Sequence, residues 1–217
     1  MNNPPQAIPL TLADVAAHPG DFYRTVTLSS GETLTFRPLL PDDITRLAEF
    51  LADLAPQTRA FSTFPSYDLT TAQEMCTAIA RYDKLRLVAT AAERIVALFE
   101  LSFDLTATDV ARYHSYDIPL DKATDCRFGP TIADEYQNRG LGSRLLPYVF
   151  DLARSFGQRR MILWGGVMAH NHRAIHHYQK HGFQIAGTFH KDANIVCYDM
   201  IVHIPETQCN TNTKSGV

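Results

Sequence analysis

The hydrophobic positions of this chain change their spacing several times along its 217 residues. β-Branched and polar residues alternate on both sides of the turn at Gly31 and Glu32, which predicts a β-hairpin that closes at Arg37 and Pro38. A helix of about three turns is then expected from Pro41, because apolar residues recur at helical spacing at Ile44, Leu47, Phe50, Leu51 and Leu54. A second helix should begin with a cap at Thr70 and Thr71.

The remaining two thirds of the chain alternate between strands and helices. The pattern predicts strands at residues 85–91, 95–103, 126–133, 161–167, 183–189 and 195–204, and helices at 141–156 and 171–181. Residues 104–123 show no clear period, and a connection of that length is usually functional or mobile. Phe61, Phe64 and Tyr67 either line a substrate groove or cap the core, and we favour the core.

The two ends differ from this central part. Residues 1–22 are rich in Pro and Ala, and we interpret them as an arm or short helix outside the core. Residues 205–217 are polar and aperiodic, which predicts a disordered tail. The middle, residues 23–204, is then one folded domain.

Composition narrows the possible partners. With 20 Lys and Arg against 23 Asp and Glu, the net charge is -3, so the chain lacks the positive field that holds nucleic acid. The four cysteines form no C-x-x-C pair, which favours reduced thiols over a zinc site or disulfides. No stretch approaches the roughly 20 apolar residues of a membrane span, and no leader pattern is visible. We therefore expect a cytoplasmic protein without a nucleic-acid or membrane partner.

A glycine-containing turn between a strand and a helix is the main chemical signal. Residues 137–143 read Gln-Asn-Arg-Gly-Leu-Gly-Ser, so backbone without Cβ can approach an anion at a helix N-terminus, where free N–H groups favour pyrophosphate. The turn is not a dinucleotide fingerprint, because Leu145 stands where the third glycine is required. It is not a P-loop either, since no Gly-Lys-Ser/Thr follows.

Gln137, Gly140 and Gly142 match Q/R-x-x-G-x-G/A, the hallmark of the GNAT superfamily of acyl-CoA-dependent N-acyltransferases. Residues 171–183 resemble the later N-x-x-A-x-x-x-Y-x-x-x-G-F segment of that family. This resemblance implies an α/β (α+β) fold with a mixed, strongly twisted central sheet of about six to seven strands and helices on both sides. It also implies acetyl-CoA as co-substrate, with its pantetheine arm along residues 129–133.

The resemblance further implies a set of cofactor-binding residues: Thr131, Ile132, Gln137, Asn138, Arg139, Gly140, Leu141, Gly142, Ser143, Asn171 and Tyr178. Tyr178 would be the catalytic acid that protonates the leaving thiolate, and a purely packing role is the alternative. Asn171 can cap its helix, bind the pantetheine arm, or do both. Pro147 and the pair Gly165–Gly166 depart from regular helix and strand, which could reshape the acyl pocket.

The general base stays open. Cys126 occupies a strand position where some family members place a glutamate, which argues against the direct glutamate mechanism. The candidates are Glu100, Asp104, His114 and Asp125. Five histidines lie between His170 and His181, and we favour a solvated basic face beside the CoA phosphates over a metal site. No metal is expected.

The acceptor is an amine of undetermined kind. The start of the domain loosely resembles GNAT domains that acetylate protein lysines, and a small amine, such as a polyamine or an amino sugar, is the alternative. A different hypothesis is a CoA-binding sensor without turnover, because no base is evident. A homodimer is possible if residues 195–204 form an exposed end strand that pairs with a second copy.

Overall fold

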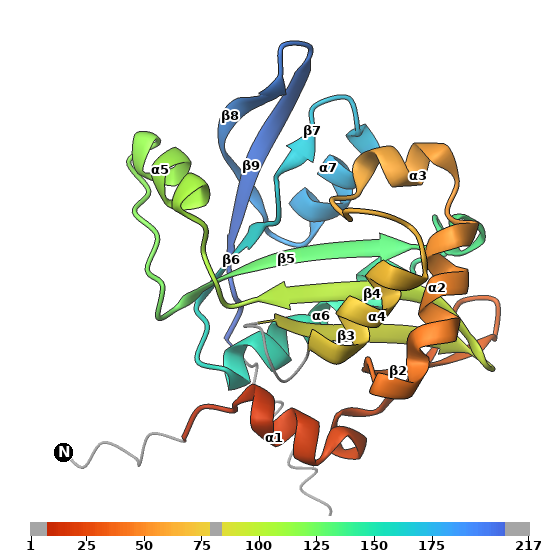
Figure 1. Ribbon diagram of the computed structural model, residues 1–217. Helices are drawn as coiled ribbons and strands as arrows, with labels where there is room; N and C mark the ends of the chain where they lie inside the picture. The colour runs from red at the N-terminus through yellow and green to blue at the C-terminus, as the bar shows by residue number, and fades with distance from the viewer. Residues whose placement is uncertain (1–7, 79–83, 207–217) are drawn as a thin grey trace, which may run out of the picture.

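The computed structural model describes residues 8–78 and 84–206, which form one nine-stranded sheet with helices around it (Figure 1). The strands run β1-β2-β3-β4-β5-β6-β9-β7, and β8 pairs with β9. Their bounds are β1 Arg24–Thr27, β2 Thr33–Pro38, β3 Lys84–Ala91, β4 Arg94–Ser102, β5 Asp125–Ile132, β6 Arg160–Leu163, β7 Val167–Met168, β8 Gln184–Asp192 and β9 Ile195–His203. The mixed α/β fold is confirmed, with more strands than the resemblance implies.

Two predictions about individual strands are wrong. The expected strand 161–167 divides into β6 and β7, because Gly165 and Gly166 adopt positive φ angles of 71° and 68° that end the extended backbone. β9 is not an end strand: it pairs with β6 and β7 along one side and with β8 along the other. Its backbone groups are therefore engaged, which removes the proposed route to a homodimer.

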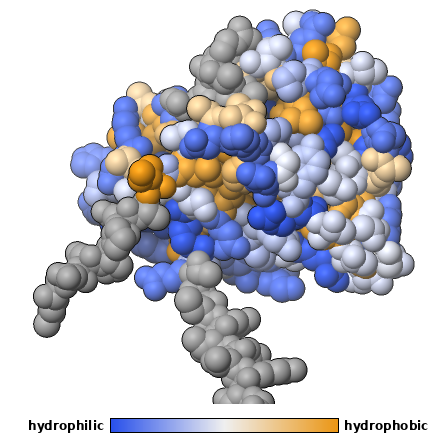
Figure 2. All heavy atoms as spheres, turned by 90° about the horizontal axis from the view of Figure 1, so that it is seen from below, coloured by the Kyte–Doolittle hydropathy of each residue, from blue (hydrophilic) through white to orange (hydrophobic). Residues whose placement is uncertain are grey.

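Helices cover both faces of the sheet (Figure 1). They are α1 Leu12–Ala17, α2 Ile44–Asp53, α3 Pro56–Phe61, α4 Leu69–Thr77, α5 Ala107–Ser115, α6 Leu141–Ser155 and α7 His172–Lys180, with single 3-10 turns at Pro19–Phe22, Pro41–Asp43 and Asp134–Tyr136. α2 buries Leu47, Phe50 and Leu51 against the core, as its spacing predicts. On the face shown in Figure 2, apolar side chains gather in small groups among hydrophilic ones.

Three local expectations need correction. The N-terminal helix exists, but it lies on the core, because Val15 is fully buried and the Leu10 N–H donates to the Ser155 carbonyl at 2.8 Å. The cap of α4 is Asp68, whose carboxylate accepts from the Thr71 N–H at 3.0 Å. α3 was not expected at all.

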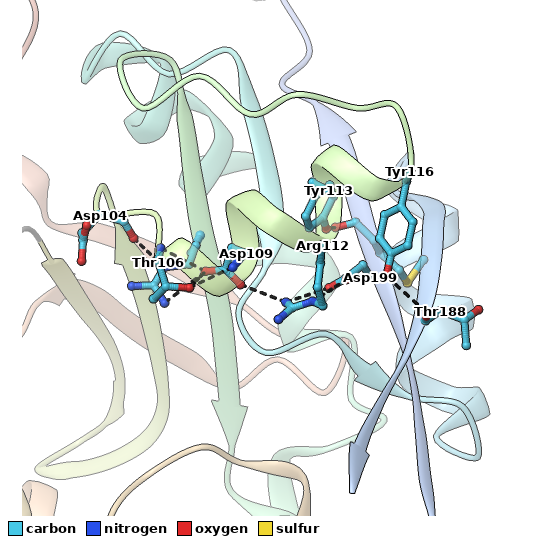
Figure 3. Close-up of polar contacts among 10 residues, drawn as sticks. Asp104, Thr106, Asp109, Arg112, Tyr113, Tyr116, Thr188 and Asp199 are labelled. Atoms are coloured by element: carbon cyan, nitrogen blue, oxygen red, sulfur yellow. Dashed lines mark hydrogen bonds and ion pairs between the residues drawn. The ribbon is translucent and has the colours of Figure 1, made fainter. Parts of the chain in front are cut away.

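The connection 104–123 also contains a helix that its sequence period does not show. α5 begins with a capping box in which Thr106 and Asp109 satisfy each other's backbone N–H groups. Figure 3 shows how polar side chains fasten this helix: Arg112 donates to Asp109 at 2.9 Å and to the buried Asp199 of β9 at 2.8 Å. Tyr113, fully buried, donates to the Met200 carbonyl. The helix is thus bound to β9 by charge and hydrogen bonding.

The described residues include three of the four cysteines and show which helices could cross a membrane. Cys76, Cys126 and Cys197 are buried and unpaired, while Cys209 lies outside the described residues. Within residues 8–78 and 84–206, no helix combines the length and apolar character that crossing a membrane requires.

Candidate active site

An opening between β5 and β6 creates the site. The two parallel strands pair only as far as Phe128 and Leu163, after which β5 continues alongside β4 to Ile132. The Ala133 N–H donates to β4, and the Phe128 carbonyl accepts from Trp164 on the opposite side. Because backbone groups alternate along a strand, those of Pro130 and Ile132 face the open edge, whereas those of Thr131 face β4. A ligand chain can pair along this edge.

The turn 137–143 closes one end of the opening. Gly140 caps α6 with a φ of 79° and no side-chain hydrogen bond, and Asn138 shares the left-handed conformation with a φ of 59°. The first-turn N–H groups of Leu141, Gly142 and Ser143 have no intrahelical acceptor. The Gln137 amide folds back onto the Ile132 carbonyl at 2.9 Å and holds the turn against β5. This arrangement offers several N–H donors to one anion.

Gly142 allows close packing at the start of α6. A Cβ at this position would lie 3.2 Å from the His177 Cε1 atom and 3.5 Å from the Ile132 Cδ1 atom. The absence of a side chain lets α7 and β5 approach the N-terminus of α6. A larger residue would displace these neighbours or project into the opening.

A cavity of about 320 Å³ connects the turn with the open strand edge. The predicted cofactor-binding residues that line it are Thr131, Ile132, Gln137, Asn138, Gly140, Leu141, Gly142, Ser143, Asn171 and Tyr178. These residues come from β5, the turn, α6 and α7, so two motifs that are separate in sequence meet at one site.

Arg139 is the predicted residue that the cavity lining does not include. Its guanidinium donates to the Glu32 carboxylate at 2.6 Å and to the Ser30 hydroxyl at 3.2 Å, and it lies 4.7 Å from the centre of the Tyr136 ring. The hydrogen bond from Tyr136 is the main interaction that holds the pKa of Glu32 below its usual range, and Arg139 lowers this pKa further. The side chain thus ties the turn to the β1–β2 hairpin.

Tyr178 projects into the cavity from α7. The residue is 8% exposed, its ring packs against Phe183, and its hydroxyl has no hydrogen-bond partner within residues 8–78 and 84–206. Burial raises the pKa of this phenol, so the group stays protonated at neutral pH and can donate. A buried tyrosine hydroxyl usually finds a partner, and an unpaired one facing a cavity is available to a ligand.

Asn171 and the histidines are placed differently from one another. The Asn171 side chain accepts from the Ala174 N–H at 3.2 Å and also lines the cavity, which leaves both of its predicted roles compatible.

His172 and His176 are exposed, as expected of a solvated face. His177 is not: burial lowers its pKa to about 4, and it is neutral against the turn. In the described part of the chain, no three His, Cys, Asp or Glu side chains are placed to hold a metal ion.

None of the candidate general bases lines the cavity. Glu100 is buried and accepts from Arg86 at 2.8 Å, and Asp125 is buried against Arg160. Burial raises the pKa of the Cys126 thiol. Asp104 and His114 are exposed on the α5 side. These side chains are therefore not placed to take a proton from a ligand in the cavity.

The end of the cavity away from the turn is assembled from segments that the sequence did not connect. α3 and the loop after it contribute Phe61, Ser62 and Thr63, whereas Thr58, earlier in α3, accepts from the Gln137 amide at 3.1 Å and lines the cavity beside the turn. Phe61 lines the cavity and lies 5.7 Å from the His170 ring, whereas Phe64 and Tyr67 pack against the core, as favoured for these aromatics. Across the cavity, a Cβ on Gly165 would lie 3.3 Å from Thr63, and one on Gly166 would lie 2.7 Å from Phe189.

The open strand edge, the N–H-rich turn and the tyrosine thus lie around one cavity of an α/β domain. The model of the acetyltransferase (GNAT) family matches residues 47–183, and the chain therefore belongs to that family and is an acyltransferase. Acetyltransferase PA5475 of Pseudomonas aeruginosa is 29% identical over 146 residues, which are 67% of this chain and 73% of the relative.

Solved structures have the same fold. The GNAT domain of S. lividans PAT superposes with a TM-score of 0.64 at 21% identity, covering 85% of this chain and 98% of that one. AAC(6')-Ib, solved in complex with ribostamycin and coenzyme A, gives a TM-score of 0.60 at 18% identity, covering 85% of this chain and 99% of that one.

Proposed function

We propose that this protein transfers an acetyl group from acetyl-CoA to a primary amine and that Tyr178 is the catalytic acid. The observation that carries the proposal is the Tyr178 side chain, which lines a cavity between the open edge of β5 and the turn 137–143 and whose hydroxyl has no partner among the described residues. The N–H groups of the turn suit the pyrophosphate, and the Pro130 carbonyl and Ile132 N–H suit the amides of the pantetheine arm. Coenzyme A in the AAC(6')-Ib structure supports the same ligand class.

The reaction needs few protein groups. The amine nitrogen attacks the thioester carbonyl, a C–N bond forms as the C–S bond breaks, and the thiolate takes a proton from the Tyr178 hydroxyl. The amide product loses one proton, which passes to water or to the phenolate, because the cavity lining contains no carboxylate among the described residues. A protein lysine and a small amine are both chemically suitable acceptors, and the enzyme must bind either one with its amine neutral.

The test is the release of CoA from acetyl-CoA in the presence of amines, measured by free-thiol detection. The Tyr178→Phe variant should lower kcat by about 100-fold and change the KM for acetyl-CoA little, because it removes one proton donor and no ligand-binding backbone. Tyr148→Phe is the matched control, since Tyr148 lies on the exposed side of α6 and should leave kcat unchanged.

The alternative is a CoA-binding sensor without turnover, which the carboxylate-free cavity lining favours. Tight acetyl-CoA binding without thiol release from any amine would support the sensor. Turnover that Tyr178→Phe leaves intact would instead show that another group protonates the thiolate.

A further inference from the structure

We propose that the acceptor is a small primary amine that also carries an anionic group, and that Lys191 binds this anion. The anion is a carboxylate or a phosphoryl-type group. The inference rests on the proposed function, because it identifies the acceptor of that reaction. It follows from how charge is distributed around the cavity.

The lining of the cavity differs from the chain as a whole. Acidic residues outnumber basic ones, 23 to 20, yet the lining includes no Asp or Glu within residues 8–78 and 84–206. Two cations, Arg173 and Lys191, do line it. Neither of them makes an ion pair or a hydrogen bond with the part of the chain that the structure describes. The cavity lining therefore carries two positive charges and no negative one, and both cationic side chains are exposed to solvent.

The two cations belong to different ends of the cavity. Arg173 lies close enough to Asp134 to lower its pKa, and Asp134 bonds the Thr58 hydroxyl at 2.6 Å next to Gln137, so Arg173 lies at the phosphate end. Lys191 lies at the end of β8, near the pairing of Met168 with Cys197. In Figure 1, this β8–β9 hairpin and β7 lie away from the turn that precedes α6. The CoA phosphates suit Arg173, which leaves Lys191 for the acceptor.

The carboxylates nearest to Lys191 are already engaged. Asp192 accepts from the Asn194 N–H at 2.9 Å and the Ile195 N–H at 3.1 Å, which fixes it on the hairpin turn. Asp199 is fully buried and bound to Arg112 at 2.8 Å. A polycationic acceptor would meet Lys191 as a like charge, whereas an anionic group would gain an ion pair with it.

The positive charge of Lys191 also affects the protonation of the amine, for which none of the candidate bases lines the cavity. A cation near a bound ammonium group disfavours its charged form and lowers its pKa. Until the anion of the acceptor pairs with it, Lys191 would thus favour the neutral form of the amine. Glu100 and Asp125 are paired elsewhere.

The experiment compares CoA release with two acidic amines, aspartate and aminomethylphosphonate, and with three cationic amines: spermidine, ribostamycin and a lysine peptide. We expect kcat/KM to be at least about tenfold higher for the acidic amines. The choice between aspartate and the phosphonate identifies the anion. Lys191→Glu should lower kcat/KM for the acidic amine by about tenfold and raise it for spermidine, with the KM for acetyl-CoA unchanged.

Lys122→Glu is the matched control, because Lys122 is exposed between α5 and β5 and does not line the cavity. It should change none of these constants. Preference for the cationic amines, or an acidic-amine KM that Lys191→Glu leaves unchanged, overturns this inference and leaves the proposed function standing. Absence of thiol release with every amine contradicts both.

Discussion

The phosphate end and the acceptor end of the cavity are built in opposite ways. In the proposed function, the phosphate end is formed mainly by seven consecutive residues, 137–143, through their backbone N–H groups and glycines, with the Arg173 side chain beside them. The acceptor end combines α3, the turn at Gly165 and Gly166, and the β8–β9 hairpin, and it depends on side chains. Consecutive backbone leaves a motif in the sequence, whereas a site of scattered side chains does not.

The largest expected effect concerns the phosphate end. Gly142→Trp should weaken acetyl-CoA binding about 1000-fold, roughly 4 kcal/mol, because the indole would meet His177 and occupy the place of the pyrophosphate. Isothermal titration with acetyl-CoA measures the change. Gly20→Trp is the control, since nothing lies within 4 Å of a Cβ there. Unchanged affinity in a folded Gly142→Trp protein would remove the turn from the site.

The second prediction concerns the acceptor end. Gly166→Ala should lower the free energy of unfolding by about 3 kcal/mol, because its Cβ would lie 2.7 Å from Phe189 and 2.8 Å from the Tyr198 carbonyl at a φ of 68°. Urea denaturation checks this value. Gly31→Ala has the same kind of φ, 86°, and open space, so it should cost only about 1 kcal/mol. Equal losses in both variants would mean that backbone strain alone requires Gly166.

The sequence predicted those elements that depend on local pattern. The β1–β2 hairpin, α2, β3 to β5, α6 and α7 follow from alternation, helical spacing and glycine turns, and residues 137–143 and 171–183 located one end of the cavity. α5 was missed because its signal is the pair Thr106 and Asp109, not an apolar period. The place of β9 depends on pairing with distant strands, which no local pattern encodes.

The third prediction separates two arginines at the phosphate end. Arg173 lines the cavity and is unpaired within the described chain, whereas Arg139 is held by Glu32. Arg173→Ala should therefore weaken acetyl-CoA binding about tenfold, and Arg139→Ala should change it no more than about twofold. Titrations at two salt concentrations would test the electrostatic origin of the difference. A larger loss of acetyl-CoA affinity in Arg139→Ala than in Arg173→Ala would mean that the Arg139 side chain contacts the ligand.

The smallest expected effect is a pH dependence of protein stability that arises from His177, next to Gly142 of the turn. His177 has a pKa near 4 in the folded protein, because burial lowers it and His181, Lys180 and His176 lower it further. Above about pH 6.5 the imidazole is neutral in both the folded and unfolded states, so it adds no pH dependence. Between about pH 6.5 and 4 only the unfolded chain takes up the proton, and stability falls with falling pH.

Because the ring is partly exposed, solvent screening reduces this contribution to about 1 kcal/mol. The His177→Gln variant removes the titrating group and keeps a polar side chain of similar size beside Gly142. Urea denaturation at pH 7 and pH 4.5 should show a loss of stability in the parent protein that exceeds the loss in His177→Gln by about that amount. Lys191→Gln, at the acceptor end, should follow the parent at both pH values. Identical pH dependence in the parent and His177→Gln would mean that the imidazole titrates normally and that the phosphate end does not depend on a neutral histidine.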